Sequence, residues 1–296
     1  MFKKFRANPV FDLSLNPVPE NLKKSLDLIS RSYNSSRMRN LEIMNTEESR
    51  LYGFMTNYEG ANYCWVQPTR VKSNVPEVEY DKYIRRINRD ARENKLNRLR
   101  EISVGTDCIA CYEADNHWYR AMIVGEPIND EWLVLFVDYG NFQRCHEHLL
   151  ARPIHEPQCD HFHAPLQAVC CRLYNIVPRL PSLRNEIDNK LEAFYTKHSS
   201  DFLEILVRNV RPDYVIDCDI FLCKRGAIGE NRLFKRHVGQ ELVESGLATF
   251  ADPQAAHCFL VNPTPPNSQI CITIDDEEDD KKPLMEIFKS ENRVGG

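Results

Sequence analysis

The sequence predicts a mainly β protein with helices, in the α+β class. Between residues 102 and 150, short apolar runs alternate with tight polar turns, a pattern typical of a small, strongly bent β-barrel. Strand-like runs also occur on both sides of this segment, together with stretches whose apolar residues recur at helical spacing. With 296 residues, 42% of them hydrophobic, the chain can form one large composite domain with tails.

The strands are predicted from short runs of apolar and β-branched residues bounded by turn residues. Glu59-Gly60 and Asp115-Asn116 supply such turns. Strands are expected over residues 51–55, 62–66, 108–112, 118–124, 131–137, 166–174, 203–209 and 214–223.

Helices are predicted at three places. A highly charged one covers residues 81–100, because Ile84, Ile87 and Ala91 lie on one helical face and Leu96 continues that face after a slip of one residue. The second covers residues 181–198, with a proline in its first turn. The third covers residues 231–245 and ends at Gly246, a residue type common just beyond a helix.

The two ends of the chain are mostly polar. We expect residues 1–49 to form a basic, partly disordered arm with one short amphipathic stretch around Leu22, Leu26 and Ile29. Residues 251–296 lose periodicity and contain six consecutive carboxylates at 275–280, which repel one another, so this tail is expected to be disordered.

Charge is distributed unevenly along the chain. The net charge of −5 hides a basic segment, residues 1–101, with 19 basic and 13 acidic residues, and two acidic segments after it. No apolar run approaches the length needed to span a bilayer, and no secretory signal is expected. Eleven cysteines, an odd number, are typical of reduced thiols in the cytosol. The basic, serine-containing start is a weaker match to a mitochondrial transit peptide.

The residues that indicate function lie between positions 105 and 141. If the strands form a small barrel, their ends and turns bring the rings of Tyr112, Tyr119, Phe136 and Tyr139 toward one rim. Several rings around a hole form a cage that holds a large, weakly hydrated cation. Asn141 adds an amide that can hydrogen-bond the edge of a guanidinium. From spacing alone, packing of these rings in the barrel core is the competing interpretation.

The charge of this segment also favours a cationic ligand. Between residues 102 and 142 there are seven acidic side chains and a single basic one, Arg120. Such a field attracts an arginine-rich peptide and speeds its encounter with the protein. Arg120 itself is expected to pair with Asp138 inside the barrel, and Gly140 to adopt a turn conformation that a side chain would resist.

These motifs resemble the extended Tudor domain family, a reader module of germline and small-RNA-pathway scaffolds. The strand Trp118-Tyr119-Arg120-Ala121 is followed by the turn Asp138-Tyr139-Gly140-Asn141, and residues 165–173 and 241–248 continue the similarity. The resemblance covers residues 50–250. It implies a Tudor barrel at about 102–152, joined by a long helix to a split staphylococcal-nuclease-like, OB-type barrel at 50–78 and 160–250.

The same resemblance implies a function. Carried over position by position, the family's cage for symmetric dimethylarginine falls on Tyr112, Tyr119, Phe136 and Tyr139, with Asn141 as the polar partner. The expected protein is a non-enzymatic adaptor without a cofactor. Its expected partner is an arginine-methylated peptide of an Argonaute/PIWI-type or other small-RNA-pathway protein, in cytoplasmic, perinuclear germ granules.

The sequence is open to three other interpretations. A nuclease would need clustered carboxylates, for which Asp213, Asp217 and Asp219 are the nearest candidates. A zinc site could draw on seven Cys and His residues: Cys145, His146, His148, His155, Cys159, His161 and His163. The leading alternative is a scaffold that binds unmodified proteins or RNA through its tails and basic helix, with Arg85, Arg86 and Arg89 as candidate nucleic-acid contacts.

Overall fold

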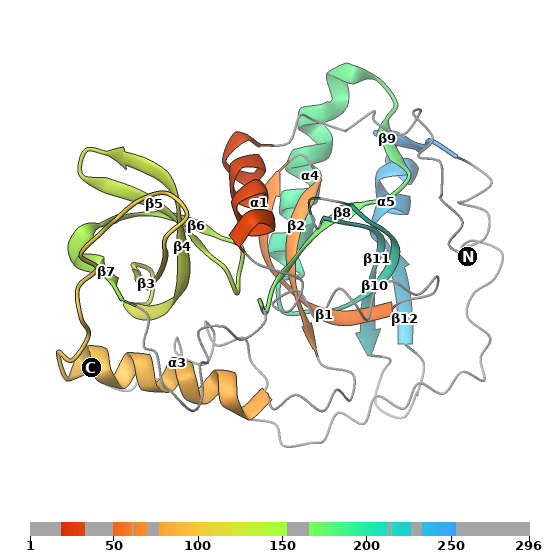
Figure 1. The fold of residues 1–296 in the computed structure, drawn as a ribbon. Coiled ribbons are helices and arrows are strands. Elements are labelled where there is room, and N and C mark those ends of the chain that lie inside the picture. Colours follow the sequence, from red (N-terminus) through yellow and green to blue (C-terminus); the bar gives the residue numbers. More distant parts are fainter. Residues whose placement is uncertain are drawn as a thin grey trace, which may run out of the picture.

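The computed structural model describes residues 19–32, 50–60, 62–69, 77–152, 166–211, 213, 215–225 and 233–252. These residues form mostly strands with several helices, which confirms the predicted α+β class. Two β-barrels lie side by side, and the ribbon passes from the larger into the smaller and back (Figure 1). Among the described helices, none is both long and apolar enough to cross a bilayer.

The larger barrel is closed because the strand at one edge of its sheet also pairs with the strand four places further along. It consists of β1 (Arg50–Gly60), β2 (Tyr63–Thr69), β8 (Val169–Leu173), β10 (Phe202–Val210) and β11 (Ile216–Arg225). The order is β10-β1-β2-β8-β11, and β10 pairs with β11 to close the ring. The β8–β11 pair is parallel and the others are antiparallel. A further strand, β12 (Leu233–His237), extends the sheet beyond β11.

The small barrel is inserted between β2 and β8 of the larger one. Its strands are β3 (Asp107–Tyr112), β4 (His117–Ile128), β5 (Glu131–Phe136), β6 (Phe142–His146) and β7 (Leu150–Ala151), in the order β6-β5-β4-β3-β7. A short 3-10 turn, η2 (Glu147–Leu149), leads into β7. The insertion separates the two halves of the larger barrel by about a hundred residues of sequence, so the core of that barrel is built from distant segments.

A helix and a short strand pair complete the larger barrel. After a 3-10 turn, η4 (Pro181–Leu183), helix α4 (Arg184–Lys197) buries Ile187, Leu191 and Tyr195 in the core of the larger barrel. The strands β9 (Ile176–Pro178) and β13 (Ala248–Phe250) pair with each other.

The third predicted helix is shorter than expected. Residues 231–245 were predicted to be helical throughout, but Leu233–His237 form strand β12, and helix α5 covers only Val238–Glu244. The change occurs at His237, whose Nδ1 accepts a hydrogen bond from the backbone N–H of Gln240 at 3.0 Å and so caps the helix. Pairing with β11 outweighs the helical pattern ahead of this cap.

The charged helix also ends earlier than predicted. Helix α3 spans Glu77–Arg92, whereas the sequence pattern predicted a helix to residue 100. Asn94 has a φ of 53°, and the N–H of Lys95 donates to the carbonyl of Asp90 at 2.8 Å, which closes the last turn. The slip of one residue at Leu96 therefore marks the end of the helix. Leu96 packs against the small barrel from a non-helical segment.

Part of the basic arm is ordered and packs between the two barrels. Helix α1 (Glu20–Ser32) lies at their junction in Figure 1. Leu22 and Leu26 are buried in a cluster that includes Trp65 of the larger barrel and Leu135 of the small one. This helix therefore ties the two barrels together.

We expect Leu26→Ala to lower the free energy of unfolding by about 2–5 kcal/mol, the range for deleting a buried leucine side chain. Chemical unfolding followed by tryptophan fluorescence measures this loss. Lys24→Ala on the exposed face of the same helix is the matched control and should change stability by less than about 0.5 kcal/mol. Equal stability of the two variants would show that α1 does not hold the barrels together.

Candidate functional site

The structure brings together the four rings predicted from the sequence. Tyr112 ends β3, Tyr119 lies in β4, Phe136 ends β5, and Tyr139 lies in the turn that follows. Tyr112 meets Phe136 with ring centroids 5.4 Å apart and planes at 79°, and Phe136 meets Tyr119 at 6.2 Å and 90°. Tyr119 meets Tyr139 at 5.2 Å and 77°. Successive rings are thus nearly perpendicular, as are adjacent walls of a box.

The rings are more deeply buried than expected. The sequence placed them at an open rim, but Tyr119 and Phe136 have no exposed surface and Tyr139 is 2% exposed. Only Tyr112 is half-buried. The rings belong to the same apolar cluster as Ile84 of α3, so core packing and ring clustering occur together here. A ligand reaches the inner ring faces only when the groups covering them move.

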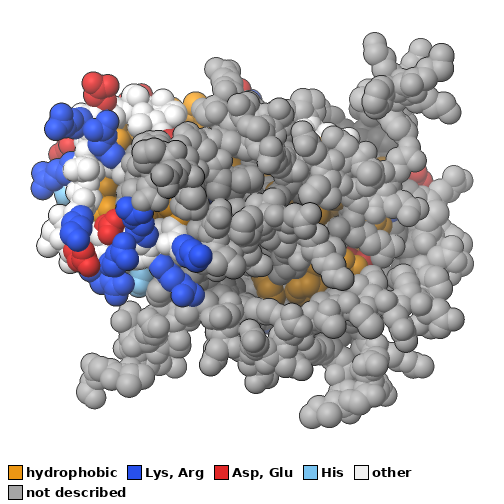
Figure 2. Space-filling view, turned by 60° about the horizontal axis from the view of Figure 1, so that its bottom comes forward, with side chains coloured by type: hydrophobic (Ala, Val, Ile, Leu, Met, Phe, Trp, Pro, Cys, Tyr) orange, Lys and Arg blue, Asp and Glu red, His pale blue; other side chains and the backbone are white. Residues whose placement is uncertain are grey.

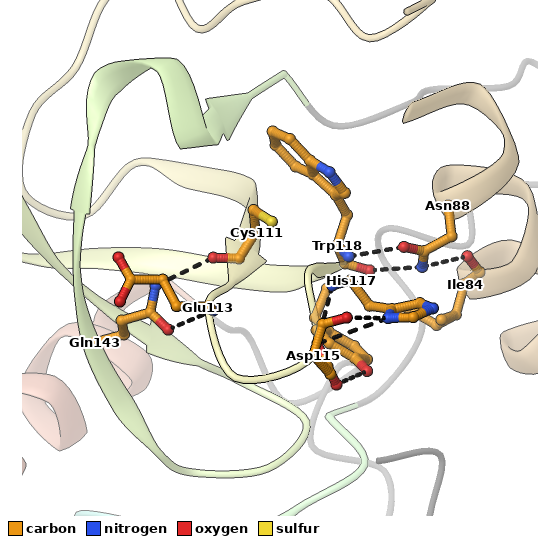
Figure 3. Close-up of polar contacts among 9 residues, drawn as sticks. Ile84, Asn88, Cys111, Glu113, Asp115, His117, Trp118 and Gln143 are labelled. Atoms are coloured by element: carbon orange, nitrogen blue, oxygen red, sulfur yellow. Dashed lines mark hydrogen bonds and ion pairs between the residues drawn. The ribbon is translucent and has the colours of Figure 1, made fainter. Parts of the chain in front are cut away.

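A buried carboxylate lies against one of the rings. The hydroxyl of Tyr119 donates to Asp115 Oδ2 at 2.8 Å, and Asp115 Oδ1 accepts from the backbone N–H of His117 at 2.9 Å. Burial, with Tyr139 and Asp115 nearby, holds the pKa of Tyr119 far above its usual range, so its ring stays neutral. Asp115 therefore places a negative charge beside the ring of Tyr119, which favours a cation there. Figure 3 shows Asp115 with its neighbour His117.

Helix α3 is hydrogen-bonded to β4, the strand that carries Tyr119. The side-chain amide of Asn88 donates to the carbonyl of Trp118 at 3.0 Å and accepts from its N–H at 2.8 Å (Figure 3). The same amide nitrogen donates to the carbonyl of Ile84 at 3.0 Å. Asn88 thus pairs with β4 as a neighbouring strand would. In the sequence, Asn88 stands beside the apolar face of this helix, and a polar residue there could have indicated a buried hydrogen-bonding contact. The sequence analysis did not single it out.

A buried ion pair fixes the turn after β5. Arg120 and Asp138 are 1% and 0% exposed. Arg120 Nε donates to Asp138 Oδ2 at 2.7 Å, and a second guanidinium nitrogen donates to Oδ1. The backbone N–H of Gln167 also donates to Asp138 Oδ1 at 3.0 Å. This bidentate arrangement is the barrel ion pair expected from the sequence.

Three side chains of the larger barrel donate hydrogen bonds to three consecutive backbone carbonyls of the same turn. Gln67 Nε2 donates to the carbonyl of Asp138 at 2.7 Å, Thr56 Oγ1 to that of Tyr139 at 2.6 Å, and Asn57 Nδ2 to that of Gly140 at 3.1 Å. The turn that supplies Tyr139 is therefore positioned by β1 and β2. No spacing rule links residues more than 70 positions apart, so sequence reasoning missed these contacts.

Asn141 presents an acceptor without a donor. Its side-chain Oδ1 is buried and has no hydrogen-bond partner among the described residues. Leaving such an oxygen unpaired costs about 1–3 kcal/mol, so a ligand N–H that reaches it is favoured. The role of polar partner, which the resemblance implies for Asn141, stays a prediction.

The candidate nucleic-acid residues lie apart from the rings. Arg85 and Arg89 are exposed on α3, and Arg86 is half-buried. Arg86 and Arg89 both approach Asp90, at 3.6 and 3.5 Å.

The aspartates considered for nuclease chemistry are engaged in ion pairs. Asp217 pairs with Arg172 at 2.7 Å, and Asp219 pairs with Arg208 at 2.5 Å. Asp213 pairs with Arg211, whose Nε lies 3.3 Å from Asp213 Oδ1.

The zinc alternative can be followed over only part of its residues. Four of the seven candidates lie outside the described part of the chain: His155, Cys159, His161 and His163. Cys145 is buried, and burial raises the pKa of its thiol to about 12. Within the described residues, no three His, Cys, Asp or Glu side chains are grouped as metal ligands.

The fold and the ring cluster define a composite of two β-barrels in which the larger barrel positions an aromatic cluster of the smaller. Residues 46–175 match the family model described as the Tudor domain. This match covers 130 of the 296 residues, and with the strands on both sides of it the chain has the fold of an extended Tudor domain.

Solved extended Tudor domains share this fold. The third such domain of mouse TDRD1, in complex with a MILI peptide containing dimethylarginine, superimposes with a TM-score of 0.56 and 16% identity, covering 70% of this chain and 96% of that one. The extended Tudor domain of Drosophila melanogaster Papi, in complex with a Piwi N-terminal peptide, has a TM-score of 0.54 and 16% identity, covering 68% and 99%.

Curated relatives are much longer proteins. Human RING finger protein 17 is 26% identical over 164 residues, which are 53% of this chain and 10% of that protein. The Xenopus laevis protein called Tudor domain-containing 6-like is 32% identical over 124 residues, which are 42% and 6%. The chain thus spans about a tenth or less of the relatives it matches.

Proposed function

We propose that the chain is a non-enzymatic adaptor that binds peptides containing symmetric dimethylarginine, through Tyr112, Tyr119, Phe136, Tyr139 and Asn141. One observation carries the proposal: four rings form a continuous edge-to-face series, and the unpaired Oδ1 of Asn141 is buried on the next residue but one after Tyr139. Ring faces attract the methylated guanidinium, and the amide oxygen accepts from its remaining N–H groups.

The energetics fit a weak, reversible reader. Each cation–π contact contributes about 0.5–2 kcal/mol, so a few of them with peptide contacts give a dissociation constant on the order of micromolar. The carboxylate of Asp115 lies against the Tyr119 hydroxyl and strengthens the field that a cation meets. Because three rings are buried, we expect binding to open the cluster at Tyr112, its most exposed member.

The proposed partner is an arginine-methylated segment of an Argonaute/PIWI-type or other small-RNA-pathway protein. The similar extended Tudor domains of TDRD1 and Papi were solved with methylarginine peptides of MILI and Piwi, which supports this class of ligand. With such a partner, we propose that the protein works in the cytoplasm, in perinuclear germ granules.

Calorimetry with three versions of one arginine-glycine peptide tests the proposal. We expect the wild type to bind the symmetrically dimethylated peptide with micromolar affinity and the asymmetric and unmodified forms more weakly. Tyr119→Ala and Tyr139→Ala should each weaken binding of the symmetric peptide at least tenfold, because each removes one wall of the cage.

The matched control is Tyr139→Phe, which keeps the ring face and loses only the hydroxyl. It should bind within about threefold of wild type. Circular dichroism establishes that each variant is folded. If both alanine variants bind all three peptides as wild type does, the cage is not the binding site.

A further inference from the structure

The solvent side of helix α3 is strongly basic. The opposite side of the helix buries Ile84 and Ile87 in the core of the small barrel. On the exposed side, basic residues recur every three or four positions: Lys82, Arg85, Arg89 and Arg92. At 1.5 Å per residue, this row extends over about 15 Å. Figure 2 shows lysine and arginine side chains gathered on this part of the surface.

The fold extends this row beyond the helix. The segment after α3 carries Arg98, which forms an isolated bridge with Ala151 at the end of the small barrel. The backbone N–H of Arg152 donates to the carbonyl of Asn97 at 2.8 Å, so Arg152 joins bases that are more than fifty residues away in sequence. We call the following set the basic face: Lys82, Arg85, Arg86, Arg89, Arg92, Lys95, Arg98, Arg100 and Arg152.

Acidic neighbours do not balance the basic face. Asp90 pairs with Arg86 and Arg89, and Glu93 pairs with Lys95. Within the described part of the chain, the other six bases form no ion pair with a carboxylate. Positive charges crowded on one helix repel each other, and this repulsion lowers stability unless an anion binds. The pKa of Glu93 is lowered, chiefly by Lys95 and also by Arg89 and Arg92, as expected in a positive field.

Within the part of the chain that the structure describes, the basic face has no apolar anchor for a protein or a membrane. Among the described residues, the exposed large hydrophobic side chains are Val104, Ile128 and Leu180, and none belongs to the basic face. Protein interfaces rely on buried aromatic or aliphatic anchors, and membrane-surface helices on an inserted apolar face. A surface of charge alone fits a polyanion.

We propose that the basic face binds the sugar-phosphate backbone of an RNA strand without sequence preference. Seven of its nine bases are arginines, whose planar forks match phosphate oxygens in bidentate fashion. Among the side chains that the structure describes on α3 and in the segment after it, no aromatic one is exposed to stack with bases, so recognition is electrostatic and depends steeply on salt. The buried side of α3, with Ile84 and Ile87, packs in the same cluster as the rings, whereas Arg85, Arg89 and Arg92 are exposed, so RNA and a peptide can bind together.

Fluorescence anisotropy with a labelled 20-nucleotide single-stranded RNA and the full chain tests this proposal. We expect binding at 50 mM salt, with a log–log salt slope of about −3 to −4 for about five phosphate contacts. The triple variant Arg85→Gln, Arg89→Gln, Arg92→Gln should bind at least tenfold more weakly, with a slope shallower by about 2.

A control variant carries the same change of charge elsewhere. Lys23→Gln, Lys24→Gln, Lys197→Gln removes three exposed positive charges from α1 and α4 and should bind RNA within about twofold of wild type. Thermal unfolding should show the arginine variant to be at least as stable as wild type, because repulsion is relieved. Tyr139→Ala should keep full RNA affinity, so this proposal and the methylarginine proposal can fail separately.

Two outcomes would overturn the proposal. One is equal RNA affinity and equal salt slope for wild type and the arginine triple variant. The other is absence of RNA binding at 50 mM salt, both by wild type and by a chain whose six carboxylates at 275–280 are changed to amides. The second chain removes the acidic segment as a competitor for the basic face.

Discussion

Asp138→Ala is expected to lower the free energy of unfolding by about 3–5 kcal/mol, because it leaves the guanidinium of Arg120 buried without its counter-charge. Asp138 also accepts from the backbone N–H of Gln167, so the variant leaves that donor unpaired as well. Chemical unfolding measures the loss, and peptide calorimetry should show at least tenfold weaker binding, since the turn that carries Tyr139 loses its anchor.

The matched control removes both charges. Arg120→Met combined with Asp138→Leu replaces the ion pair by apolar groups of similar size, and such replacements are often neutral or stabilising. We therefore expect the double variant to be more stable than Asp138→Ala alone. The opposite order would show that Arg120 stabilises the fold even without Asp138, so that an uncompensated buried charge is not the cause of the loss in Asp138→Ala.

Gly140→Ala is expected to have a comparable effect, of about 3–5 kcal/mol, for two physical reasons. Gly140 has a φ of +83°, which side chains resist, and an added Cβ would lie 1.9 Å from Cγ of Trp65 on the larger barrel. The methyl group must push the turn away from β2, and this strains the hydrogen bond from Asn57 to the carbonyl of Gly140.

Gly246→Ala separates the backbone strain of a positive φ from the steric clash of an added Cβ. Gly246 has a similar φ of +74°, but the nearest atom to an added Cβ, on Arg179, is 4.0 Å away. This control should therefore cost only about 1–2 kcal/mol of backbone strain. Thermal unfolding of the two variants compares them directly. If they lose equal stability, Trp65 does not press on the turn as the structure indicates.

Peptide affinity distinguishes the two glycine variants further. Gly140 stands between Tyr139 and Asn141, so its displacement should weaken binding of the methylated peptide, whereas Gly246→Ala should leave binding unchanged. Both measurements use the folded full chain.

Local rules predicted most of the secondary structure because strands and helices have short repeats. The apolar runs of the small barrel predicted β3, β4 and β5, and the apolar face of α4 predicted that helix, whereas the short strands β6 and β7 were not predicted. The same rules failed at two boundaries. Helix α3 stops at Arg92 because Asn94 adopts a positive φ, and α5 starts at Val238 because residues 233–237 pair with β11. Strand pairing outweighs local preference in the second case.

The sequence by itself determined the identities and the order of the groups at the candidate site: four rings, the amide of Asn141, the Arg120–Asp138 pair and a glycine at the turn. Only the tertiary structure decided how they are arranged. It buries three of the rings, places Asp115 against Tyr119 and makes Thr56, Asn57 and Gln67 hold the turn.

Tertiary structure likewise brings Arg152 to the basic face. The physical reason is the same in each case. Helical and strand periods report neighbours within a few residues. Apart from Asp115 and Tyr119, which are four positions apart across a turn, these contacts join residues from more than fifty to more than eighty positions apart. The packing of two barrels and three core clusters determines their approach.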